Sequence, residues 1–148
     1  MHPFPHRYEV AATAAAEGAV TLVAAGLPAL ASDGPVEFEG PGDQWSPETL
    51  LTGALVDCFV LSFRAVAKAS KFAWLRLDCR AEGTLDRIDR VTQFVAFTVH
   101  ARLTLPPQAD ADRARKLLAK SEQVCLISSS LKAATHLEIE LVYAATVS

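Results

Sequence analysis

Residues 46–63 have the sequence SPETLLTGALVDCFVLSF and predict the first part of a long helix. Ser46 is a preferred N-cap residue, Pro47 suits the first helical position, and Glu48 complements the positive end of the helix dipole. From Pro47 to about Ser70, apolar side chains leave little polar face around the helix. We therefore expect this helix to be buried on several sides.

The chain has three cysteines, which differ in their sequence environment. Cys58 lies in the middle of the predicted helix, where a thiol is either an inert packing residue with a raised pKa or a reactive group. Cys79 takes a core-facing position of an alternating strand and is expected to be a small buried hydrophobe. Cys125 lies at a predicted helix start, whose dipole favours a thiolate. Three cysteines are too few for a disulfide scaffold, so any disulfide is expected to be catalytic.

Hydrophobic alternation predicts the remaining elements. The segments 74–85 and 94–105 carry apolar residues at odd positions, which is typical of half-buried strands. The order β-β-α-β-β-α-α-β, with tight hairpins, predicts an α+β fold with a mainly antiparallel sheet. The 148 residues fit a single domain. Besides the long helix, we expect strands at 7–13, 19–24, 74–85, 94–105 and 137–143, a loop at 32–44, and helices from about Asp110 and at 125–132.

Composition excludes several classes of protein. A net charge of -3 and a pI near 5.8 are unfavourable for neutralising phosphates, so we expect no nucleic-acid partner. No stretch approaches the roughly 20 uncharged apolar residues that cross a bilayer, so we expect a cytoplasmic protein without a membrane partner. The odd number of cysteines fits a reducing compartment. The sequence has no Cys-His ligand spacing and no Gly-rich phosphate loop, so we expect no metal.

Three sequence motifs together resemble one known family. They are Ser46–Leu51, Cys58-Phe59 and Cys125–Lys132, which read SPETLL, CF and CLISSSLK. In these motifs the chain resembles the OsmC/Ohr family, the osmotically inducible protein C-like and organic hydroperoxide resistance proteins. The match extends from about residue 38 to the C-terminus. The resemblance implies an OsmC-like fold, in which a curved sheet packs on a long central helix within an intertwined homodimer.

The resemblance also implies an activity, the thiol-dependent reduction of organic hydroperoxides. Cys58 would be the peroxidatic thiol, Cys125 the resolving thiol, and Glu48 the carboxylate that helps position a cationic partner. Peroxide would convert Cys58 to a sulfenic acid, which Cys125 would condense into a disulfide. An external dithiol would reduce it. That dithiol is lipoyl-based in some family members, and no metal, flavin or haem is required. An apolar pocket favours an apolar hydroperoxide over hydrogen peroxide, and its expected lining is Leu55, Phe59 and Phe63.

The role of Glu48 is constrained by its position. Ten residues of α-helix rise about 15 Å, so Glu48 cannot touch Cys58 of its own straight helix. One hypothesis is that Glu48 acts on the thiol of the partner subunit, directly or through an arginine. The other is that it only complements the helix dipole.

Two features depart from the family pattern. Active members use an arginine upstream of the helix to lower the thiol pKa. The position that matches the arginine of one branch is Glu37, and the region that matches that of the other branch reads Ala16-Glu17-Gly18, so neither offers a cation. Asp57 adds a negative charge beside Cys58, which disfavours the thiolate. The alternatives are therefore a weak or inactive module that binds an apolar or thiol-bearing small molecule, or a thiol redox sensor. The candidate cations for the place of the arginine are Arg7, Arg64 and Lys68.

Overall fold

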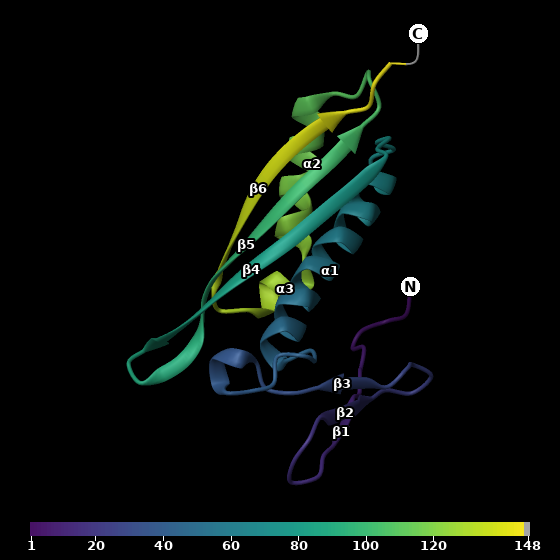
Figure 1. Ribbon diagram of the computed structural model, residues 1–148. Helices are drawn as coiled ribbons and strands as arrows, with labels where there is room; N and C mark the ends of the chain where they lie inside the picture. The colour runs from purple at the N-terminus through teal and green to yellow at the C-terminus, as the bar shows by residue number, and fades with distance from the viewer. Residues whose placement is uncertain (147–148) are drawn as a thin grey trace. The chain divides into compact units, whose positions relative to one another are not determined.

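The computed structural model describes residues 1–146 and contains two compact units, the first from Met1 to Leu51 and the second from Thr52 onward. Each unit has its own three-stranded sheet. Helix α1 (Pro47–Ala69) begins in the first unit and continues in the second (Figure 1). The elements confirm the predicted α+β class, and each unit is described by itself below.

The N-terminal unit contains an antiparallel sheet of three short strands. Strands β1 (Ala11–Thr13) and β2 (Val20–Val23) form the predicted hairpin. The strand β3 (Leu30–Ser32), which pairs with β2, was not predicted. It has only three residues, too few for apolar and polar positions to alternate recognisably. A single 3₁₀ turn, η1 (Val36–Phe38), lies in the loop that precedes α1.

The start of α1 agrees with the prediction from Ser46 and Pro47. The backbone N–H of Ser46 donates to the Thr49 hydroxyl at 2.8 Å, and the Thr49 N–H donates to the Ser46 hydroxyl at 3.1 Å. This reciprocal pair is equivalent to a capping box, with Thr49 in the place of the usual Glu or Gln. After the last helical residue, Lys71 adopts a left-handed conformation (φ 52°), which ends the helix close to the expected Ser70.

The C-terminal unit forms a sheet in the order β4-β5-β6. Strands β4 (Arg76–Ile88) and β5 (Val91–Leu105) are the predicted antiparallel hairpin. Strand β6 (Ala134–Tyr143), however, runs parallel to β5. The expectation of hairpins without a βαβ connection was therefore wrong at this point, because parallel neighbours require a crossover. That crossover consists of the helices α2 (Ala111–Val124) and α3 (Leu126–Ser130).

One face of this sheet forms the core with the helices. Figure 1 shows α1 and α2 along the same face. Arg113 of α2 donates a hydrogen bond to the Ser70 carbonyl and lies over the Phe72 ring at 5.5 Å, which ties α2 to the end of α1. The buried apolar residues are Leu55, Phe59, Phe63 and Ala67 of α1, alternate residues Phe97 to Leu105 of β5, and Ala114 and Leu118 of α2.

Only one stripe of α1 is buried in the single chain, so burial of the helix on several sides stays a prediction that depends on an interface. Leu61, on another face, is 51% exposed. By length and composition α1 could cross a membrane, and only 22% of its most apolar 18-residue segment is buried. Asp57 and Arg64 interrupt the helix, so it does not contain the stretch of roughly 20 uncharged residues that the sequence analysis looked for. Core helices of globular proteins can be equally long and apolar, so the length and composition of α1 are weak evidence for a membrane.

Candidate functional site

Cys58 and Cys125 lie together in the C-terminal unit. Cys58 is half-buried on α1, whereas Cys125 is buried between α2 and α3. Both are free thiols, and their side chains form a hydrogen bond with each other. The crossover through α2 and α3 thus brings together two thiols that are 67 residues apart in the chain. An oxidised Cys58 would have a second thiol beside it.

A tight turn at the start of α3 surrounds the two sulfur atoms. The Cys125 sulfur accepts a hydrogen bond from the Ser128 backbone N–H at 3.5 Å, as an N-cap side chain does. The backbone N–H groups of Leu126 and Ile127 donate to the Cys58 sulfur. The Ser128 hydroxyl lies 3.4 Å from a Glu122 carboxylate oxygen and 3.3 Å from the Thr135 hydroxyl. These contacts hold the turn against α2 and β6.

The same contacts shift the pKa values of the two thiols in opposite directions. Burial alone would raise the pKa of Cys58, but hydrogen bonds from Ile127, Cys125, Ser62 and Leu126 outweigh burial and lower this pKa below the ordinary thiol value. Burial raises the pKa of Cys125, and the neighbouring Cys58 raises it further. Cys58 is therefore the thiol that ionises first, while Cys125 keeps its proton and donates it to the Cys58 sulfur.

Ser62 is a site residue that the sequence analysis missed. Its hydroxyl lies 3.9 Å from the Cys58 sulfur, one helical turn further along α1. Residues at i and i+4 are neighbours on a helix surface. This spacing was visible in the sequence and could have identified Ser62 once Cys58 was chosen.

The predicted apolar lining of the pocket lies in the core. Leu55 and Phe59 are each 1% exposed and Phe63 is 0% exposed. The Phe63 ring also packs edge-on against Trp74, with 5.2 Å between the ring centroids. These side chains share the α1 stripe that faces the sheet, and a role in substrate binding stays a prediction.

Glu48 belongs to the N-terminal unit, so the structure does not place it beside either thiol of the C-terminal unit. It is half-buried and lines a largely apolar hollow of about 380 Å³ within its own unit. The role of Glu48 towards the thiol of a second subunit stays a prediction. The hollow is lined by Val20, Leu22, Ser32, Asp33, Gly34, Pro35, Phe38, Pro47, Glu48 and Leu50.

The charged residues that the sequence analysis considered as influences on the Cys58 thiol are all exposed. Glu37 and Glu17, from the two segments that the sequence analysis compared with the family's arginines, are exposed, as is Asp57 on α1. The candidate cations Arg7, Arg64 and Lys68 are exposed as well. Within the C-terminal unit, the groups named above that lower the pKa of Cys58 are all electrically neutral donors.

Cys79 differs from the other two thiols. It is half-buried on β4, and burial together with the adjacent Asp78 carboxylate raises its pKa to about 11. At neutral pH it is therefore protonated, and a protonated thiol is a poor nucleophile. This agrees with the structural role expected from its strand position.

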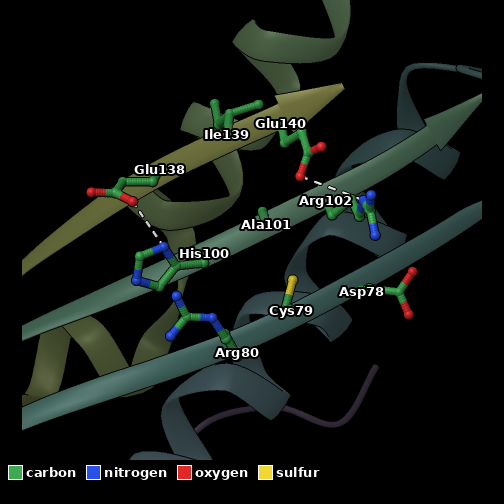
Figure 2. A pocket seen from close by; sticks show the side chains of 9 residues that line it. All are labelled: Asp78, Cys79, Arg80, His100, Ala101, Arg102, Glu138, Ile139 and Glu140. Atoms are coloured by element: carbon green, nitrogen blue, oxygen red, sulfur yellow. Dashed lines mark ion pairs between the residues drawn. The ribbon is translucent and has the colours of Figure 1, made fainter. Parts of the chain in front are cut away.

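The opposite face of the β4-β5-β6 sheet carries a shallow, charged hollow of about 470 Å³. Figure 2 shows the charged side chains of this hollow in front of the strands, with the helices behind. His100 bridges two carboxylates, at 2.8 Å from Glu138 and 3.1 Å from Glu82, and Arg102 lies 3.4 Å from Glu140. Within residues 1–146, no group of three or more His, Cys, Asp or Glu side chains is arranged to hold a metal ion. These cross-strand ion pairs connect the three strands on the face away from α1 and the pair Cys58 and Cys125.

Comparison with known proteins identifies a matching family and one curated relative. The family of OsmC-like proteins matches residues 40–140. An uncharacterized protein, YmaD of Bacillus subtilis (strain 168), is 27% identical over 109 residues, which cover 72% of this chain and 73% of YmaD.

Solved structures share the fold. An OsmC-like protein of unknown function from Vibrio cholerae has a TM-score of 0.83 at 15% identity, covering 92% of this chain and 100% of that one. An organic hydroperoxide resistance protein from Elizabethkingia anophelis has a TM-score of 0.77 at 18% identity, with coverage of 97% and 100%. An organic hydroperoxide resistance protein OsmC from Legionella pneumophila has a TM-score of 0.74 at 22% identity, with coverage of 95% and 99%.

Proposed function

Because the chain belongs to the family of OsmC-like proteins, we propose that it is a thiol-dependent peroxidase that reduces organic hydroperoxides. The observation that carries the proposal is the pairing of Cys58 and Cys125, with the pKa of Cys58 lowered and that of Cys125 raised. A two-cysteine peroxidase needs this asymmetry, because one thiol must attack as a thiolate and the other must wait as a thiol.

The reaction follows from this arrangement. The Cys58 thiolate attacks one oxygen of the hydroperoxide, the O–O bond breaks, and the alkoxide leaves and takes up a proton to become an alcohol. Cys58 is then a sulfenic acid, and the Cys125 sulfur displaces its hydroxyl as water to form a disulfide. An external dithiol, which we propose to be lipoyl-like, reduces that disulfide by thiol–disulfide exchange and is itself oxidised.

A homodimer is part of the proposal. The exposed apolar face of α1, including Leu61, needs a cover that the described residues do not provide. A second copy of the chain would cover it and would also bring a second Glu48 into the assembly. A chain whose apolar helix is covered in this way needs no membrane, and we propose that it works in the cytoplasm.

Apolar hydroperoxides are the proposed substrates. The residues around Cys58 on α1 are largely apolar. Apolar walls bind an alkyl or aryl group better than they bind hydrogen peroxide. We therefore expect cumene hydroperoxide and tert-butyl hydroperoxide to be consumed faster than hydrogen peroxide.

The test compares the wild type with Cys58→Ser and Cys125→Ser. Reduced protein is mixed with cumene hydroperoxide or hydrogen peroxide in the presence of dihydrolipoamide, peroxide loss is followed, and disulfides are mapped by mass spectrometry. We expect turnover to vanish in Cys58→Ser, while Cys125→Ser consumes about one equivalent of peroxide and stops without a Cys58–Cys125 disulfide. Turnover that survives in Cys58→Ser would contradict the proposal.

A second candidate is favoured by the glutamates at the family's arginine positions, Glu17 and Glu37. Without that cation the protein could be a redox sensor, in which the disulfide forms but turns over slowly. In the same experiment, a stoichiometric Cys58–Cys125 disulfide that dihydrolipoamide does not reduce would favour the sensor over the enzyme.

A further inference from the structure

The hydrogen-bond donors around Cys58 suggest how the thiol is activated without the family's arginine. Ser62 presents its hydroxyl 3.9 Å from the Cys58 sulfur, which is within reach of a hydrogen bond to sulfur. The turn of α3 presents the backbone N–H groups of Leu126 and Ile127 to the same sulfur. All of these groups are neutral, and Ser62 lies outside the three sequence motifs.

We propose that Ser62, together with the backbone N–H groups at the start of α3, takes the place of the family's arginine by donating hydrogen bonds to the Cys58 thiolate. The assignment concerns the same thiol and rests on the proposed function. Ser62 then acts on the nucleophile itself and not on the substrate. Its hydroxyl proton stays on Ser62 throughout, because a serine hydroxyl is a far weaker acid than a thiol.

The position of Ser62 supports this role over a purely structural one. Serine is no better than average as a helix former, so helix stability does not favour it in the interior of α1. A mid-helix serine usually donates to the carbonyl four residues back or points to solvent. Here the hydroxyl is half-buried and adjacent to the sulfur. A hydrogen bond from a hydroxyl stabilises a thiolate more than a neutral thiol, because bonds to charged groups are about twice as strong.

The assignment has a consequence for substrate choice. An arginine that binds the peroxide also attracts carboxylate groups, whereas neutral donors do not. The charged residue next to the thiol in the sequence is Asp57, which is exposed and repels anions. The protein should therefore prefer uncharged hydroperoxides to hydroperoxides that carry a carboxylate, such as those of fatty acids.

The test measures Cys58 directly, without peroxide. Reduced wild type, Ser62→Ala, Ser62→Thr and the control Ser129→Ala, which alters an exposed serine of α3, are alkylated with iodoacetamide at a series of pH values. The Cys58 peptide is quantified by mass spectrometry. We expect Ser62→Ala to move the pH midpoint of Cys58 alkylation upward and to slow alkylation at neutral pH about three- to tenfold, in line with the loss of one charge-assisted hydrogen bond.

The two other variants make the result specific. Ser62→Thr keeps a hydroxyl and should restore most of the wild-type midpoint, whereas Ser129→Ala should leave it unchanged. Alanine is the best helix former, so Ser62→Ala should fold, and circular dichroism checks this. An unchanged midpoint in folded Ser62→Ala would overturn the assignment.

Peroxide turnover, measured in parallel, separates the two proposals. A shifted midpoint in Ser62→Ala together with an inactive wild type would refute the peroxidase and leave the Ser62 assignment intact. A fully active wild type with an unshifted midpoint in Ser62→Ala would do the reverse.

Discussion

Cys125 affects Cys58 before any peroxide is present, because its thiol donates a hydrogen bond to the Cys58 sulfur. Cys125→Ala removes that donor and should raise the pKa of Cys58, so that Cys58 alkylation at neutral pH slows about threefold or more. Cys125→Ser keeps a hydroxyl as a hydrogen-bond donor, so the pKa of Cys58 in this variant should lie between its values in Cys125→Ala and in the wild type. Site-resolved alkylation across pH measures this. Cys58 in the wild type should reach its plateau rate at a lower pH than Cys125, and the opposite order would contradict the assignment of the nucleophile.

Cys79 should make stability depend on pH in the alkaline range. Its pKa rises from 9.0 to about 11 in the folded chain, mainly through burial. The folded state therefore holds the proton more tightly than the unfolded state. The resulting stability is fully present below about pH 9 and is lost as the pH approaches about 11. Urea unfolding of the wild type and Cys79→Ala should show a difference in unfolding free energy that shrinks between these limits. A difference that stays constant would mean that Cys79 titrates normally.

Asp57 should discriminate between charged and neutral reagents. It is exposed on α1 beside Cys58, so its effect is partly screened by salt. Asp57→Asn should raise the rate of Cys58 alkylation by the anion iodoacetate about twofold at low salt, with little change for neutral iodoacetamide. The ratio of the two rates cancels general changes in thiol reactivity. A ratio equal to that of the wild type would show that Asp57 exerts no field at the sulfur.

At the scale of elements, the β4-β5 hairpin depends on a glycine opposite an aromatic residue. Gly83 pairs with Phe97, and a Cβ at Gly83 would lie 2.7 Å from the Phe97 ring and 2.9 Å from the Phe94 ring. The two rings stack at 4.8 Å, and Phe97 is fully buried, so neither can move freely. Gly83→Ala should therefore lower the unfolding free energy by about 1–3 kcal/mol.

The neighbouring residue supplies the control for this hairpin. Thr84 is exposed on the same strand, so Thr84→Ala should change the unfolding free energy by about 0.5 kcal/mol or less. Urea unfolding measures both variants. Equal stability of Gly83→Ala and the wild type would mean that the rings yield to the added methyl group.

Helix caps and hydrophobic alternation predicted most of the helices and strands. The features that they missed have physical causes. The cap at Ser46 and the alternation in β4 and β5 were decisive because they depend on neighbouring residues alone. The direction of β6 was missed because alternation is the same in parallel and antiparallel strands. The pairing of Cys58 with Cys125 came from family motifs, since helical periodicity cannot bring distant residues together. Ser62 was missed because the spacing of four residues from Cys58 was not considered, although it places the two side chains side by side on the helix.

At the scale of the whole molecule, the outer face of α1 is an apolar surface that the single chain leaves exposed. Leu61 lies two residues after Phe59, about 200° around the helix from the buried stripe, and is 51% exposed. An apolar helix of this length needs either a protein partner or lipid, because large exposed apolar patches are uncommon in monomers. The second copy of the chain that we propose would cover this exposed apolar face. The assembly is therefore open to a direct test.

Leu61→Glu places a carboxylate on this face and should convert a dimer into a monomer, because burying an unpaired charge at an interface costs several kcal/mol. Gln123→Glu, which adds the same charge at an exposed position of α2, is the control and should stay dimeric. Light scattering without detergent measures the mass, and cumene hydroperoxide consumption measures activity. If Glu48 acts on the thiol of the partner subunit, monomeric Leu61→Glu should lose at least about tenfold in rate while retaining its helical circular dichroism. A wild type that is monomeric and fully active would refute both the dimer and this role of Glu48, whereas a wild type that dissolves only with detergent would identify lipid as the cover of α1.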